Sequence, residues 1–197
     1  MSLNSKVTII DYGAGNIQSL LFAFERLGTQ AVLSSDPETI SNSDHVVFPG
    51  VGAAGAAMKK LKQTGLNTLI PELKQPVLGI CLGMQLMCEF SEEQNTEGLN
   101  IFDSKVQKFD SSLKIPCIGW NTVTFESEGL YKGISSGAYM YFVHSYFVPL
   151  QNASSGITNY GLDYSASLEK DNFFGVQFHP EKSALEGSQI LSNFLKL

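Results

Sequence analysis

The sequence predicts an α/β fold of three layers, in which helices cover both faces of a mostly parallel central sheet. Two observations lead to this fold class. In the first half of the chain, short apolar runs typical of buried strands alternate with segments whose apolar residues recur at helical spacing. In the second half, strand-rich segments separated by Gly, Ser and Asn turns predict antiparallel additions to the sheet. Functional side chains are therefore expected at the carboxyl ends of the parallel strands.

The alternation begins with a β-rich run at residues 6–11, which ends in a glycine-containing turn. Apolar residues then recur at helical spacing from Ile17 to Leu27, and Gly28 follows them. Further strands are predicted at residues 30–33, 45–48 and 76–80, and further helices at residues 53–61 and 85–90.

The second half is predicted from its β-branched and aromatic runs, which lie between turn residues. The predicted strands are residues 105–106, 122–125, 139–143, 164–168 and 173–178. A final helix carries Ile190, Leu191, Phe194 and Leu195 on one face.

Length and charge limit the possible partners. The 197 residues are enough for one sizeable core, so residues 1–197 are expected to form one domain. A net charge of −6 argues against nucleic acid or an anionic membrane as a partner, because both are themselves negatively charged. No apolar run approaches the ~20 residues of a membrane span. The odd count of three cysteines, without paired spacing, suggests a reducing cytoplasm.

Cys81 stands at the centre of a Gly-Ile-Cys-Leu-Gly turn between a predicted strand and a predicted helix. Glycines two positions before and two after it allow tight packing, while the central side chain is held exposed in a strained turn. The positive end of the following helix dipole favours a thiolate. A buried structural cysteine at a strand end fits this pentapeptide as well. Cys88, two helical turns later, is expected to pack in the core.

The segment His179-Pro180-Glu181 follows the last predicted strand and supplies what a cysteine nucleophile needs. A base must take or share the thiol proton, and an acceptor must hold the base in one tautomer. His179 and Glu181 are two residues apart and project to the same side of an extended chain. By itself the segment also fits a polar turn, but the presence of Cys81 in the same chain favours a catalytic triad.

The other histidines fit the role of base less well. His45 opens a predicted strand at the end opposite the expected site, which favours a surface or capping role. His144 has no neighbouring carboxylate to orient it. The spacing of Cys and His residues does not match a zinc site, so no metal is expected.

Two glycine-containing loops at strand ends admit specific interpretations. In residues 49–52, glycines flank Val51, whose N–H is a candidate oxyanion donor beside the N–H of Leu82. The same glycines permit a peptide flip, and an ordinary turn is the alternative. Gly13-Ala14-Gly15 weakly suggests a dinucleotide site, but Gln18 occupies the third glycine position of that motif. A plain turn, with Asn16 and Gln18 exposed on the carboxyl-end face, fits better.

Taken together, these segments resemble the class I (triad) glutamine amidotransferases, and more closely their subfamily of glutaminase subunits that serve imidazole glycerol phosphate synthases. The resemblance runs in order through most of the chain and departs at Cys117 and Ile118, where histidine and methionine are expected. It is carried by residues 11–16, 49–52, 79–85, 119–121, 141–146 and 177–183.

The resemblance implies hydrolysis of L-glutamine through a Cys81 thioester, without a cofactor. It implies that ammonia passes to a (β/α)8-barrel cyclase subunit, with which the chain forms a heterodimer in histidine biosynthesis. It assigns glutamine binding to Gly52, Gln85, Glu93, Ser145 and Tyr146. Our candidates for the face toward the partner are Asn16, Trp120, Tyr141 and Lys182.

Three other functions remain open at this level. A related amidotransferase subunit would deliver ammonia to another acceptor, such as a sugar of a surface polysaccharide. A nucleotide- or flavin-binding module would use the turn at Gly13 and Gly15. A non-catalytic scaffold is disfavoured because all three triad residue types are present.

Overall fold

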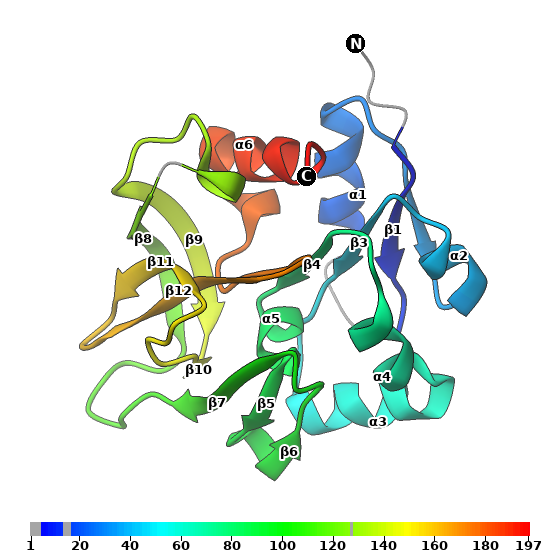
Figure 1. Cartoon of the computed structure of the whole chain (residues 1–197). Coiled ribbons are helices and arrows are strands. Elements are labelled where there is room, and N and C mark those ends of the chain that lie inside the picture. The colour runs from blue at the N-terminus through cyan, green and yellow to red at the C-terminus, as the bar shows by residue number, and fades with distance from the viewer. Residues whose placement is uncertain (1–4, 14–16, 127) are drawn as a thin grey trace.

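The computed structural model describes residues 5–13, 17–126 and 128–197, and its centre is a nine-stranded sheet (Figure 1). The strand order is β2-β1-β3-β4-β13-β12-β11-β8-β9. Pairing is parallel from β2 to β13 and antiparallel from β13 to β9. The strands are β1 (Val7–Ile10), β2 (Ala31–Ser34), β3 (His45–Phe48), β4 (Val77–Ile80), β8 (Cys117–Phe125), β9 (Ala138–His144), β11 (Ser154–Asn159), β12 (Asp163–Lys170) and β13 (Phe173–Val176).

Helices cover both faces of the parallel half (Figure 1). Alternate residues of a strand point to opposite faces, so Val47 packs in one apolar cluster while Val46 and Phe48 pack in the other. The first cluster includes Phe24 of α1 and Phe194 of α6. The α-helices are α1 (Ile17–Arg26), α2 (Pro37–Ser41), α3 (Ala54–Thr64), α4 (Leu66–Leu69), α5 (Leu82–Leu86) and α6 (Ala184–Phe194), with 3-10 turns η1 (Ile70–Glu72), η2 (Glu93–Asn95), η3 (Gly129–Tyr131) and η4 (Pro180–Lys182).

These layers confirm the predicted fold class, with antiparallel strands added in the C-terminal half. The parallel strands β1, β3, β4 and β13 are successive neighbours, so their carboxyl ends meet at one edge. Tyr12, Pro49, Cys81 and His179 lie within three residues of those ends. The topology thus brings together segments that are far apart in the sequence.

The predicted helix over residues 85–90 was wrong. Helix α5 ends at Leu86, and Cys88 begins strand β5 (Cys88–Ser91) of a second sheet of order β10-β7-β5-β6. A Cβ on Gly98 would lie 2.0 Å from the Cys88 carbonyl oxygen, so this glycine permits a close backbone approach. Tertiary strand pairing therefore overrides the local helical pattern. The other strands of this sheet are β6 (Thr96–Glu97), β7 (Phe102–Lys108) and β10 (Tyr146–Phe147).

Candidate active site

Cys81 occupies a strained turn between β4 and α5. Its backbone has φ 53° and ψ −108°, a positive φ that non-glycine residues rarely adopt. Gly83 allows this turn to pack, because a Cβ there would lie 1.9 Å from the carbonyl oxygen of Phe48. A Cβ on Gly79 would lie 2.8 Å from the backbone nitrogen of Met84. Both glycines predicted for the elbow are therefore required by close backbone approaches.

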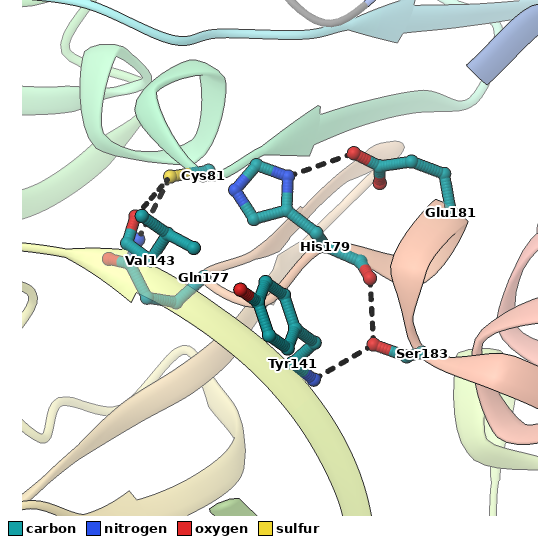
Figure 2. A network of polar contacts seen from close by, with 7 residues as sticks. All are labelled: Cys81, Tyr141, Val143, Gln177, His179, Glu181 and Ser183. Carbon is teal, nitrogen blue, oxygen red and sulfur yellow. Dashed lines mark hydrogen bonds and ion pairs between the residues drawn. The ribbon is translucent and has the colours of Figure 1, made fainter. Parts of the chain in front are cut away.

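Cys81 is nearly buried, 7% exposed, and two polar groups besides His179 contact its sulfur. The thiol donates to the carbonyl oxygen of Val143 at 3.6 Å, and Nε2 of Gln177 donates to the sulfur at 3.6 Å. The ring of His179 lies beside the same sulfur (Figure 2).

His179 and Glu181 form a buried pair at the exit of β13. Nδ1 of His179 lies 2.9 Å from Oε1 of Glu181, and their side chains are 6% and 2% exposed. Burial lowers the pKa of His179, but hydrogen bonds and charge from Cys81 and Glu181 outweigh that effect and raise the pKa to about 10. The geometry favours an imidazolium that lies between two acidic groups.

The backbone of His179 is anchored to β9. Its N–H donates to the carbonyl oxygen of Tyr141 at 2.8 Å. The hydroxyl of Ser183 donates to the carbonyl oxygen of His179 at 2.7 Å and accepts from the Tyr141 N–H at 3.0 Å (Figure 2). The backbone of His179 is therefore held through both its N–H and its carbonyl oxygen.

The loop at residues 49–53 lies against the start of α5. A Cβ on Gly50 would lie 2.6 Å from the backbone nitrogen of Gly83, so the loop passes next to the Leu82 segment. The hydroxyl of Tyr12 donates to the carbonyl oxygen of Pro49 at 2.7 Å and fixes the start of the loop. Gly52 has φ +105°, and a Cβ there would meet no neighbouring atom within 4 Å, so backbone conformation and not space requires glycine at this position.

One cavity of about 280 Å³ brings most of the predicted site residues together. Among the predicted residues, its lining includes Val51, Gly52, Cys81, Leu82, Gln85, Glu93, Ser145, Tyr146, His179 and Lys182. Glu181 lies behind His179, as an orienting group would. This volume lies just below the usual range for ligand pockets and suits a small ligand.

Two of the predicted glutamine-binding side chains already have protein partners. The amide NH₂ of Gln85 donates to the carbonyl oxygen of Tyr146 at 2.8 Å and to Oε1 of Gln177 at 2.9 Å. One carboxylate oxygen of Glu93 accepts from the N–H of Ala54 at 2.8 Å, at the start of α3. Both residues thus shape the cavity wall, and Glu93 ties that wall to the loop at residues 49–53.

Three of the four candidates for the partner face lie on β8, β9 and η4. Trp120 is 51% exposed and is paired across the strands with Tyr141, with the rings in an edge contact at 5.9 Å. Nζ of Lys182 lies 5.9 Å from the centre of the Tyr141 ring. Asn16, Ala14 and Gly15 lie outside the described residues.

The interpretations of His45 and of Cys88 need correction. His45 is buried, 6% exposed, and packs edge-on against Phe194, because strand β3 begins beneath α6. Burial lowers its pKa. Cys88 is buried as expected but lies in β5, and burial raises its thiol pKa to about 12.

His144 has a structural place in the core. Nδ1 lies 2.8 Å from the carbonyl oxygen of Tyr146, and Nε2 lies 3.0 Å from the hydroxyl of Tyr164. Burial, the largest influence, lowers its pKa to about 4, which favours a neutral ring. A neutral ring with both nitrogens engaged suits packing better than catalysis.

Sequence reasoning missed three residues that hold the site: Tyr12, Gln177 and Ser183. All three are buried; Tyr12 and Gln177 follow strand ends within two residues, and Ser183 precedes α6. Their positions beside the motifs were visible, but Tyr12, Gln177 and Ser183 each bond to at least one residue that is distant in sequence. Within residues 5–13, 17–126 and 128–197, no cluster of three or more His, Cys, Asp or Glu residues is arranged to hold a metal ion. None of the helices described there is long and apolar enough to cross a membrane.

The chain is similar to known proteins in both sequence and structure. The family model "Glutamine amidotransferase class-I" matches residues 8–197. The imidazole glycerol phosphate synthase subunit HisH of Bacteroides fragilis is 50% identical over 195 residues, covering 98% of this chain and 100% of the relative. The HisH subunit of Bacteroides thetaiotaomicron is 48% identical over the same shares. A crystal structure of a glutamine amidotransferase superposes with a TM-score of 0.76 at 16% identity, covering 96% of this chain and 97% of the other.

Proposed function

The chain belongs to the class I glutamine amidotransferase family, among the HisH subunits of imidazole glycerol phosphate synthase, and we propose that it hydrolyses L-glutamine as the glutaminase subunit of that synthase in histidine biosynthesis. The observation that carries this proposal is that Cys81 and His179 line one cavity together with Val51, while Glu181 is paired with His179. Delivery of ammonia to another acceptor, such as a sugar, has less support, because the full-length relatives are synthase subunits.

In the proposed mechanism, the Cys81 thiolate attacks the carbon of the glutamine side-chain amide. The N–H groups of Val51 and Leu82 donate to the oxyanion that forms, an interaction worth about 3–4 kcal/mol per donor. The His179 imidazolium gives its proton to the amide nitrogen, so ammonia leaves and a thioester remains. His179 then takes a proton from water, which attacks the thioester and releases glutamate. Glu181 holds the imidazole in orientation throughout.

We propose that glutamine is recognised by residues of the same cavity that Cys81 and His179 line. The Glu93 carboxylate takes the substrate ammonium, while Gly52, Ser145 and Tyr146 enclose the backbone of the amino acid. Gln85 supports this wall through the carbonyl of Tyr146. The shared cavity lining of all five residues supports this assignment.

The partner is proposed to be a cyclase subunit of (β/α)8-barrel type, bound as a heterodimer in the cytoplasm. The exposed apolar side chains of β8 and β9 support a docking face there: Ile118 is 62% exposed, Trp120 51% and Tyr139 61%. Tyr141 belongs to the same strand pair, and its backbone bonds directly to the His179 segment. A partner on this face would therefore contact the strand that holds the base. We also propose that residues 1–197 act as one domain, because strands of both halves pair in one sheet.

We expect the isolated chain to be a poor glutaminase that the nucleotide-loaded cyclase activates, through rotation of the peptide at Val51. The test is glutamate release by the chain alone and after addition of the cyclase subunit with its nucleotide ligand. Full activity without the partner would contradict activation.

The Cys81→Ala variant should abolish glutamine-dependent synthesis by the complex and leave ammonia-dependent synthesis intact. Loss of both would point to misfolding or to another mechanism.

A further inference from the structure

The buried side-chain amide of Gln177 contacts the sulfur of Cys81. The residue is fully buried, immediately after β13, and its N–H donates to the carbonyl oxygen of Ala166 at 2.8 Å. Its side-chain Nε2 lies 3.6 Å from the sulfur of Cys81, a distance at which an amide donates to sulfur (Figure 2). None of the roles described above requires this contact.

The orientation of this amide follows from a chain of contacts that starts at a backbone carbonyl. The oxygen of Tyr146 can only accept, so the group of Gln85 that faces it at 2.8 Å must be the NH₂. The same NH₂ lies 2.9 Å from the Gln177 side chain, which must therefore present its oxygen to Gln85. The NH₂ of Gln177 is left facing Cys81.

Apart from His179, the sulfur has two polar contacts, and these favour opposite protonation states. The carbonyl of Val143 accepts from a thiol and repels a thiolate. The Gln177 amide donates to the sulfur, and this hydrogen bond strengthens when the sulfur carries a negative charge. In a buried site, such a donor is worth more than in water. Gln177 thus offsets the carbonyl of Val143 on the same atom.

We propose that Gln177 stabilises the Cys81 thiolate and aims its sulfur into the cavity, and that Gln85 orients the Gln177 amide for this purpose. The role of the thiolate rests on the proposed function, but the contact itself does not involve glutamine or a partner. Gln85 then has two tasks, because the same NH₂ holds the carbonyl of Tyr146 in the cavity wall. A movement of Tyr146 would therefore be transmitted to Cys81 through the side-chain amides of Gln85 and Gln177.

The test is alkylation of Cys81 by iodoacetamide across pH, followed by mass spectrometry, in the isolated full chain without glutamine. Only the thiolate reacts appreciably, so the rate reports the thiolate fraction whether or not the chain is a glutaminase. Gln177→Met removes the donor at similar volume. Gln189→Met is the matched control, because the Gln189 amide in α6 donates to Asn193 and not to the site.

Loss of a hydrogen bond to a charged group should move the alkylation midpoint up by about one pH unit and slow alkylation at neutral pH about tenfold. In the complex, kcat for glutamine should fall by a similar factor while KM changes much less. Gln189→Met should behave as wild type. A folded Gln177→Met protein with the wild-type alkylation profile would overturn the proposal, as would an effect on KM alone.

If Gln177→Met does not fold, Gln85→Met decides the matter, because it removes the group that orients the Gln177 amide. An upward shift of the alkylation midpoint in this variant supports the proposal, and an unchanged midpoint refutes it. A wild-type chain with the expected alkylation behaviour but no glutaminase activity in any complex would refute the proposed function and leave the role of Gln177 intact.

Discussion

Replacement of Glu181 by glutamine tests whether this carboxylate holds His179 as an imidazolium. The variant keeps the shape of the side chain and removes its charge, at a contact of 2.9 Å between two buried groups. If the glutamine presents its oxygen to His179, its NH₂ occupies the place of Oε2, which has no hydrogen-bond partner among the described residues. If it presents the NH₂ instead, that group meets a donor on the imidazolium.

A hydrogen bond between charged groups contributes about 1.5–3 kcal/mol, and one pKa unit corresponds to about 1.4 kcal/mol. The pKa of His179, about 10 in the wild type, should therefore fall by about one to two units in Glu181→Gln. The measurement is NMR titration of the His179 ring, with Glu186→Gln in α6 as a control that keeps the pair intact. An imidazole that titrates near 6.5 in the wild type, or an unchanged value in the variant, would refute the reasoning.

The same shift predicts how stability depends on pH. The pKa of His179 is raised above its ordinary value of 6.5, so the folded state binds the proton more tightly than the unfolded state does. This contribution to stability is fully present below about pH 6.5 and is lost as pH rises through about 10. In Glu181→Gln the loss should begin at lower pH, which urea unfolding at a series of pH values measures.

Three further substitutions test separate parts of the site. Gly83→Ala should destabilise the fold by more than ~3 kcal/mol in urea unfolding, because its Cβ would lie 1.9 Å from a backbone oxygen; wild-type stability would contradict the close approach. Glu93→Gln should raise KM for glutamine at least tenfold through loss of charge on the substrate ammonium, and an unchanged KM in steady-state kinetics would remove Glu93 from glutamine binding. Trp120→Ala should weaken binding of the cyclase subunit by about 2 kcal/mol in calorimetry without altering Cys81 alkylation, and unchanged affinity would move the interface elsewhere.

Sequence patterns predicted the parallel half of the fold well, because its strands and helices have local apolar periodicities. The proximity of Cys81 and His179 was also predictable, since both follow strands whose carboxyl ends must meet. The second sheet was not, because β5 exists through pairing with β6 and β7 and not through its own pattern. The partners of Gln177 were equally hidden, since both lie more than 90 positions away in sequence.

The loop that carries Val51 is held in a way that limits how it can rearrange. Tyr12 fixes the carbonyl of Pro49 at its start, and Glu93 fixes the N–H of Ala54 at its end. Gly50 is pressed against the backbone of α5, where it has no room for a Cβ, whereas Gly52 has open space around it. A rearrangement of the proposed oxyanion donor at Val51 is therefore confined to the peptides that flank this residue. Glu93 is also the proposed contact of the substrate ammonium, so bound glutamine would act on the end of this loop through Glu93. A partner bound to β9 would instead act on His179, through the hydrogen bond between His179 and Tyr141.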